Sequence, residues 1–161
     1  MVQSSSLQDS LNIAYRYLSY RPRSEAEIRH MLQRRRFSDQ VVEQTLARLR
    51  EQELADDAAF AMFWRDNRLT FRPKSKRLIQ KELRDKRVAS EIVEEVTTDI
   101  DDDAIAYKLG SGRMAAIGHL DYRDFYRRLS GYLGYRGFSH EVVRRTVGRL
   151  WRERQQEESL M

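Results

Sequence analysis

The stretch RPRSEAEIRHML, residues 21–32, returns 51 residues later as RPKSKRLIQKEL, residues 72–83. The same offset carries Leu32 onto Leu83, and an offset of 101 carries it onto Leu133. Apolar residues keep their places at many other positions under both offsets. A period near 50 residues with helical spacing of apolar side chains is typical of a tandem helical array.

Each repeat is predicted to hold three helices. In the first repeat, apolar residues recur at i, i+4, i+7 and i+8 from Leu7, which predicts a helix that Pro22 ends. Ser24 with Glu27 forms a capping box for a second helix, and Ser38 is placed to cap a third. The sequence therefore predicts an elongated all-α chain made of three three-helix repeats.

The repeats fix the expected domain boundaries. We expect a disordered N-terminus over 1–6, repeats over 7–54, 55–100 and 101–153, and a frayed C-terminus over 154–161. Acidic residues at Asp56-Asp57 and Asp101 to Asp103 are expected to start the first helices of the second and third repeats. In the third repeat, the three glycines Gly110, Gly112 and Gly118 predict a longer first connection.

Composition excludes most enzymatic chemistry. The chain has no cysteine, which removes disulfides, thiolate zinc sites and thiol nucleophiles. No phosphate-binding Gly-x-x-x-x-Gly-Lys-Ser/Thr loop and no Gly-x-Ser-x-Gly elbow occurs, and the three histidines lie far apart. We therefore expect a protein that is not an enzyme, with no catalytic residue, cofactor, metal or small-molecule substrate. Without an apolar run of about 20 residues or a secretory leader, we expect a cytoplasmic protein that does not enter a membrane.

Charge is strongly segregated along the chain. Between Arg65 and Arg87 there are ten basic and three acidic residues, whereas Glu91 to Asp103 holds seven acids and no base. A polyanionic partner fits the first stretch and a basic surface fits the second, although two solvated helix faces would look the same. The candidate residues for contact with such a polyanionic partner are Arg65, Arg68, Arg72, Lys74, Arg77, Lys81 and Arg84.

Four of these candidates share one helical spacing. Lys74, Arg77, Lys81 and Arg84 follow i, i+3, i+7 and i+10, which places them on one face of the second helix of the middle repeat. Such a row could follow a phosphate backbone or an acidic groove.

Two other interpretations are weaker. Paired helices such as those in residues 24–49 resemble a helix-turn-helix, but the third helices start with acids that would meet phosphate. Most aromatic residues fall on apolar faces and predict core packing, while Tyr20 and Phe71 could be surface groups for base stacking.

Four segments also resemble a known family. They are RPRSEAEI from Arg21, LADDAAFA from Leu54, IQKELRDK from Ile79 and YRGF from Tyr135. In this order they resemble the RecX family, which regulates the bacterial recombinase RecA in DNA repair, recombination and the SOS response. The resemblance covers about residues 7–153.

The resemblance implies tandem three-helix repeats that bind in the groove of a recombinase–DNA filament. It also implies inhibition of ATP hydrolysis, strand exchange and co-protease activity. The family's usual glycine before the third helix is present as Gly137, but Arg36 and Arg87 stand at the equivalent places. A non-glycine residue in a left-handed cap costs about 1 kcal/mol, so either these turns differ in geometry or the strain is tolerated.

Three functions follow in order of preference. The first is a non-enzymatic modulator of a recombinase filament, whose contact with DNA is made through the filament. The second is a general helical nucleic-acid-binding protein that acts on DNA directly. The third is a protein scaffold without a nucleic-acid role.

Overall fold

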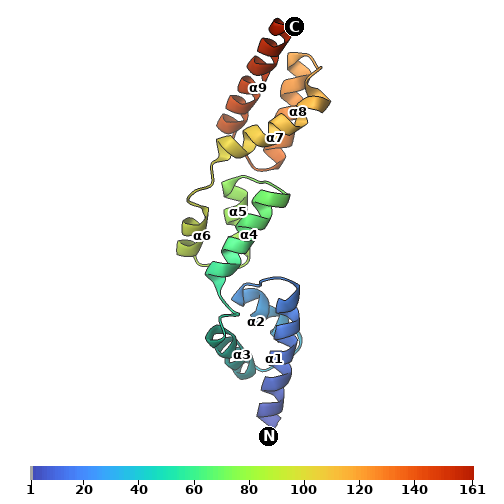
Figure 1. Ribbon diagram of the computed structural model, residues 1–161. Helices are drawn as coiled ribbons and strands as arrows, with labels where there is room; N and C mark the ends of the chain where they lie inside the picture. The colour runs from blue at the N-terminus through green and yellow to red at the C-terminus, as the bar shows by residue number, and fades with distance from the viewer. Residues whose placement is uncertain (1) are drawn as a thin grey trace. The chain divides into compact units, whose positions relative to one another are not determined.

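The computed structural model describes residues 2–161, with side chains from residue 6 onward. In this part of the chain all regular structure is helical, as predicted. The first repeat comprises α1 (Val2–Tyr20), α2 (Glu25–Arg34) and α3 (Asp39–Glu51). The second comprises α4 (Asp57–Phe71), α5 (Lys76–Asp85) and α6 (Ser90–Thr97). The third comprises α7 (Asp102–Ile117), α8 (Tyr122–Tyr135) and α9 (His140–Leu160) (Figure 1).

Equivalent leucines form the centre of the repeats. Leu32, Leu83 and Leu133 all have no exposed surface. In the first repeat Leu32 belongs to a cluster between α1, α2 and α3, and in the third Leu133 belongs to a cluster between α7, α8 and α9. The repeat alignment read from the sequence is therefore confirmed at its central position.

The predicted helix starts are also present. Ser24 and Glu27 exchange hydrogen bonds in a full capping box at the start of α2. The Ser38 and Ser139 hydroxyls accept from the third backbone N–H of α3 and α9, respectively. Asp101 caps α7 in the same way. These caps satisfy N–H groups that have no partner within the helix.

The three turns between the second and third helices share one geometry. Arg36, Arg87 and Gly137 all have positive φ, at 66°, 62° and 92°. In each turn the next N–H donates to the carbonyl of the central leucine, at 3.1 to 3.3 Å. The two arginines therefore adopt the left-handed cap in place of glycine, and the chain carries that strain.

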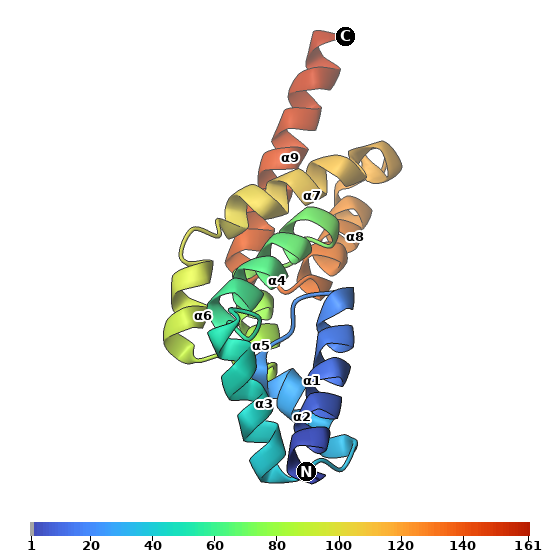
Figure 2. The same ribbon diagram turned by 60° about the horizontal axis from the view of Figure 1, so that its bottom comes forward.

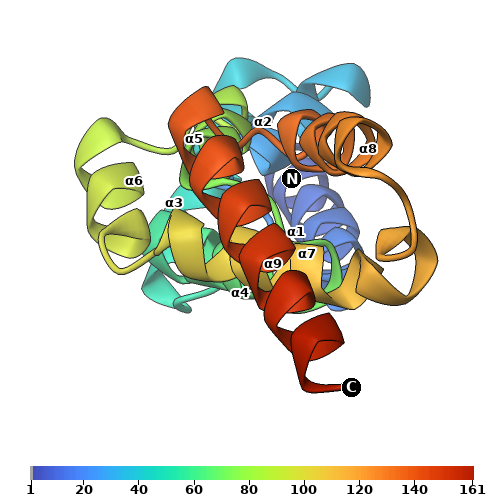
Figure 3. The same cartoon turned by 90° about the horizontal axis from the view of Figure 1, so that it is seen from above.

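One expectation about the third repeat was wrong. Gly110 and Gly112 lie inside α7 and do not form a loop, while Gly118 caps its C-terminal end. Gly110 is buried, and a Cβ there would meet the Leu150 side chain at 2.5 Å. The glycine thus allows α7 and α9 to pack closely where they cross (Figure 3).

Both ends of the described chain are helical. α1 starts at Val2, so residues 2–6 are helical although we expected them to be disordered, and Met1 lies outside the described residues. α9 runs to Leu160, past the expected fraying point, and continues beyond α7 and α8 (Figure 2). The pair Arg154–Glu158, one turn apart at 3.2 Å, supports this last part of α9.

The chain divides into two compact units, and the boundary between them runs through the middle repeat. One unit contains the residues up to Asp66 together with Glu82–Val96, and the other contains Asn67–Lys81 with Thr97–Met161. Each unit therefore holds one terminal repeat and the part of the middle repeat that packs on it.

Candidate functional site

The basic surface, our name for the seven predicted contact residues, comes from α4, α5 and the turn between them. Its members are Arg65, Arg68, Arg72, Lys74, Arg77, Lys81 and Arg84. Four of them are exposed, namely Arg72, Arg77, Lys81 and Arg84, and the other three are partly buried.

Lys74 is not part of the helical row. α5 begins at Lys76 because the Ser75 hydroxyl accepts from the Leu78 N–H at 3.2 Å, which places Lys74 in the preceding turn. The row on α5 is therefore Arg77, Lys81 and Arg84, at i, i+4 and i+7.

Arg65 and Arg84 of the basic surface make contacts within the chain. Arg65 donates to the Val96 carbonyl at 2.9 Å and to the Asp66 carboxylate, and only 24% of its side chain is exposed. It therefore holds α4 against the end of α6. Arg84 lies 3.6 Å from the Glu94 carboxylate, with both side chains exposed.

Arg72 and Lys74 line a hollow that sequence reasoning did not anticipate. Leu78, Tyr135 and Arg136 complete its lining, and Tyr135 is 90% exposed. Arg136 donates to the Pro73 carbonyl at 3.0 Å, which ties α8 to the turn before α5. The repeat offset indicates that a basic side chain recurs at this place, since Arg136 is the counterpart of Arg35 and Lys86.

A recurrent carboxylate links successive repeats. Asp56 and Asp101 cap their own helices, α4 and α7. The aspartate that follows each of them accepts from the first N–H of the preceding repeat's second helix. Asp57 accepts from the Glu25 N–H at 2.9 Å, and Asp102 accepts from the Lys76 N–H at 2.8 Å. Burial of Asp57, together with the charge of Glu25, raises its pKa in spite of this hydrogen bond. The sequence predicted that these acidic runs start helices, but it did not indicate that Asp57 and Asp102 also cap a helix of the preceding repeat.

The first and second repeats also meet through an ion-pair network. Glu27 accepts from Arg21 at 2.9 Å and from Lys86 at 2.7 Å. Both cations lie over the Trp64 ring, at 5.5 and 5.4 Å from its centroid. Burial alone would raise the pKa of Glu27, but hydrogen bonds and charge from the two cations hold that pKa below its usual range.

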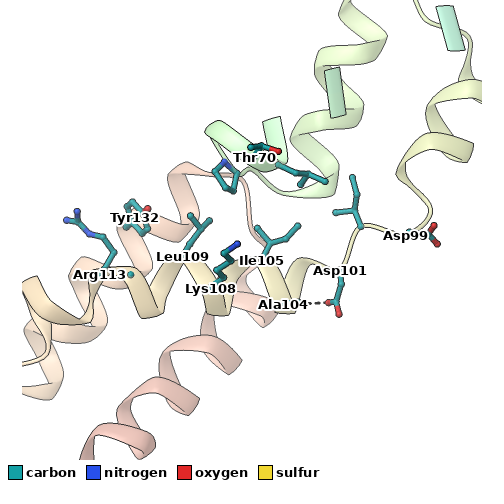
Figure 4. A pocket seen from close by; sticks show the side chains of 13 residues that line it. Thr70, Asp99, Asp101, Ala104, Ile105, Lys108, Leu109, Arg113 and Tyr132 are labelled. Carbon is teal, nitrogen blue, oxygen red and sulfur yellow. Dashed lines mark hydrogen bonds between the residues drawn. The ribbon is translucent and has the colours of Figure 1, made fainter. Parts of the chain in front are cut away.

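The C-terminal unit has an apolar groove along α7 (Figure 4). Ile105 and Leu109 of α7 line it together with Leu69 of α4 and Pro73 of the turn between α4 and α5. Figure 4 shows Arg113 and Tyr132 at one end of the groove and Asp99 and Asp101 at the other.

Two classes of site are not found in residues 2–161. No group of three or more acidic or histidine side chains there is arranged to hold a metal ion. Across the same residues, no helix combines the length and apolar character that crossing a membrane requires. The exposed aromatics Tyr20 and Phe71, at 78% and 75%, lie on the surface as the sequence suggested.

Family comparisons cover all three repeats. Residues 11–49 match the first three-helix domain of RecX, 56–96 match the second and 101–147 match the third. The chain belongs to the RecX family. Its RecX domains correspond to α1–α3, α4–α6 and α7–α9.

Two curated RecX proteins illustrate the similarity. The regulatory protein RecX of Prosthecochloris aestuarii is 32% identical over 92% of this chain and 98% of its own. That of Chlorobium phaeobacteroides is 31% identical over 89% and 94%. Membership of this family gives the chain a regulatory role.

Solved RecX structures share the fold. The crystal structure of RecX from Lactobacillus salivarius superimposes with a TM-score of 0.77 over 91% of this chain and 97% of that one, at 19% identity. A second crystal structure of regulatory protein RecX gives a TM-score of 0.75 over 90% and 74%, at 23% identity. At such low identity, the likeness concerns the helical architecture alone.

Proposed function

We propose that this chain is a non-enzymatic regulator that binds in the groove of a recombinase–DNA filament. Binding there modulates the recombinase, chiefly by inhibiting its ATPase, strand-exchange and co-protease activities. The observation that carries this proposal is the match of all three RecX domains, in order, along one chain.

The charges of the basic surface support a filament partner. Arg72, Arg77 and Lys81 are exposed and lie close together in the sequence. A filament groove offers DNA phosphates and recombinase carboxylates, and arginine binds either group through a two-pronged hydrogen-bonding contact. Arg65 would contribute less, because only 24% of its side chain is exposed.

The proposal is tested by titrating the protein into recombinase hydrolysing ATP on single-stranded DNA. Hydrolysis should fall with added protein and reach a plateau near a fixed ratio of protein to recombinase. The protein alone should show no ATP hydrolysis. Unchanged hydrolysis at every ratio would contradict the proposal.

The second candidate is direct DNA binding, which the hollow formed by Arg72, Lys74 and Arg136 favours. Binding to free single-stranded DNA, measured at several salt concentrations, separates the two. Direct binding predicts high affinity without recombinase and a steep salt dependence, whereas filament regulation predicts affinity that rises greatly when recombinase and nucleotide are present.

A further inference from the structure

The groove between the second and third helices of a repeat is filled differently in the three repeats. In the first, Arg29 of α2 crosses it to the Glu43 carboxylate of α3, with the two atoms 3.0 Å apart. In the second, Arg84 of α5 crosses to Glu94 of α6 at 3.6 Å. In both repeats an arginine of the second helix thus pairs with a glutamate of the third.

In the third repeat neither the arginine nor the glutamate of this pair is present at the equivalent positions. The counterpart of Arg29 is Ser130, and the counterpart of Arg84 is Gly134. The counterpart of both glutamates, Glu43 and Glu94, is Arg144, so the charge on the third helix is reversed.

A hollow of about 500 Å³ lies between α8 and α9 at this place. Ser130 and Gly134 line its α8 side, and Arg144 and His140 line its α9 side, with Tyr126 also in the lining. The lining contains no acidic side chain. The Ser130 hydroxyl is buried and has no hydrogen-bond partner among the described residues.

This groove therefore presents a guanidinium where its counterparts hold an internal carboxylate. Glu141, the nearest acid in sequence, lies 4.0 Å from Arg145 and does not line the groove. A carboxylate placed beside Arg144 would restore the pairing of opposite charges that the counterpart helix pairs have.

We propose that the α8–α9 groove of the third repeat receives an aspartate or glutamate side chain from a protein partner. The partner's carboxylate would pair with Arg144, as the internal glutamates pair with arginine in the first two repeats. The inference rests on the proposed function for the identity of that partner, the recombinase.

The surroundings favour a carboxylate over a nucleic-acid backbone. A phosphate backbone is held by a row of cations, but the next arginines on α9 already bind internal acids. Arg145 binds Asp103 through two hydrogen bonds of 3.1 Å, and Arg149 donates to Glu153 at 3.0 Å. Arg144 also lines a neighbouring hollow with Arg145, Arg149 and Arg152, but that hollow already contains the Asp103 carboxylate. Within the α8–α9 groove Arg144 is the one guanidinium, which suits a single acidic side chain.

The test compares the parent protein with Arg144→Glu. A matched control, Arg128→Glu, changes the same charge at an exposed position of the same repeat that does not line the groove. Affinity is measured for recombinase filaments formed on single-stranded DNA with a non-hydrolysable ATP analogue, and for the same DNA without recombinase. Arg144→Glu should weaken filament binding about tenfold or more, with a much smaller effect of the control. Neither variant should change affinity for free DNA.

A second variant keeps the result separable from misfolding. Ser130→Arg combined with Arg144→Glu rebuilds the Arg29–Glu43 pair inside the third repeat. This variant should melt at or above the parent temperature and should still bind the filament as weakly as Arg144→Glu.

Three outcomes overturn the inference. If the parent binds the filament and Arg144→Glu binds equally well, the groove is not an interface, and the proposed function stands. If Arg144→Glu weakens binding to free DNA as much as to the filament, the occupant is a phosphate. If the parent does not bind the filament at all, the proposed function fails, and the partner assigned to the groove fails with it.

Discussion

At the scale of single residues, the same left-handed backbone geometry is occupied by arginine in two turns and by glycine in the third. Arg36 and Arg87 are exposed and extend from their left-handed turns into solvent. Gly137 is buried, and a Cβ there would lie 2.5 Å from the Ser75 hydroxyl and would also collide with Leu78. Glycine is therefore required at the third turn by lack of space as well as by φ, whereas the first two turns carry only the backbone strain.

This difference predicts opposite effects of substitution. Arg36→Gly should stabilise the protein by about 0.5 to 1 kcal/mol, because it removes the left-handed strain and the gain exceeds the added entropy of the unfolded chain. Gly137→Ala should destabilise it, because its Cβ collides with α5 residues. Urea unfolding measures both, and a stabilised Gly137→Ala variant would show that the turn has room for a side chain.

The central leucines make a second residue-scale prediction. Leu32, Leu83 and Leu133 have no exposed surface, so replacement of any one by Ala should cost about 2 to 5 kcal/mol. The cost at Leu83 can differ from the others because its repeat has a neighbour on each side. Thermal melting of the three variants provides the measurement. Parental stability in all three would mean that the repeat alignment is wrong.

At the scale of elements, sequence periodicity predicted the helices better than their ends and contacts. Regular apolar spacing and serine or aspartate caps located the helix pairs, since both signals depend on neighbours within a few residues. The α7 segment was misread because Gly110 suggests a loop until its long-range neighbour Leu150 is known. Lys74 does not belong to the row on α5 for a local reason, since Ser75 caps that helix and Lys74 precedes the cap.

Contact residues were harder to predict than helices. The sequence marked the charge of residues 65–87, but it could not show that Arg65 donates to Val96 or that Arg136 joins Arg72 beside one hollow. These contacts join residues that are more than 30 positions apart. Only the repeat offset carried any information about them.

The network around Glu27 predicts how stability depends on pH. Its folded pKa lies below the unfolded value, so its ion pairs stabilise the fold fully above the unfolded pKa. That contribution is lost as the pH falls through the lower folded pKa. Glu27→Gln should therefore cost about 1 to 3 kcal/mol at neutral pH, and the gap between variant and parent should close in acid.

Urea unfolding of both proteins from pH 7 down to pH 3 measures this gap. Glu43→Gln is the control, because Glu43 forms an exposed pair with Arg29 and should contribute much less. An equal cost of Glu27→Gln at every pH would show that the Glu27 charge does not stabilise this junction.

At the scale of the whole molecule, equivalent residues make the same kinds of contact at both junctions between successive repeats. Asp57 and Asp102 cap the preceding repeats, and Lys86 and Arg136 bind residues near the start of those repeats' second helices. Nearest-neighbour packing of this kind is what lets repeats of about 50 residues form a stable protein. It also explains why the middle repeat contributes to both compact units.

The central claim is that the basic surface regulates a recombinase filament. Three of its four exposed members, Arg72, Arg77 and Lys81, can be changed together to Glu without replacing a buried residue. A control with the same change in charge replaces three exposed arginines of the first repeat, Arg16, Arg34 and Arg35. Melting curves establish that both variants are folded.

The deciding measurement is inhibition of recombinase ATPase on single-stranded DNA by the parent and the two triple variants. The account predicts that the basic-surface variant loses inhibition, most steeply at low salt where screening is weakest, while the control keeps it. If the surface touches phosphate, the log–log salt slope of binding should also flatten by about 0.7 to 0.9 for each contact removed. A folded basic-surface variant that inhibits as well as the parent, or a control that loses as much, would contradict the account.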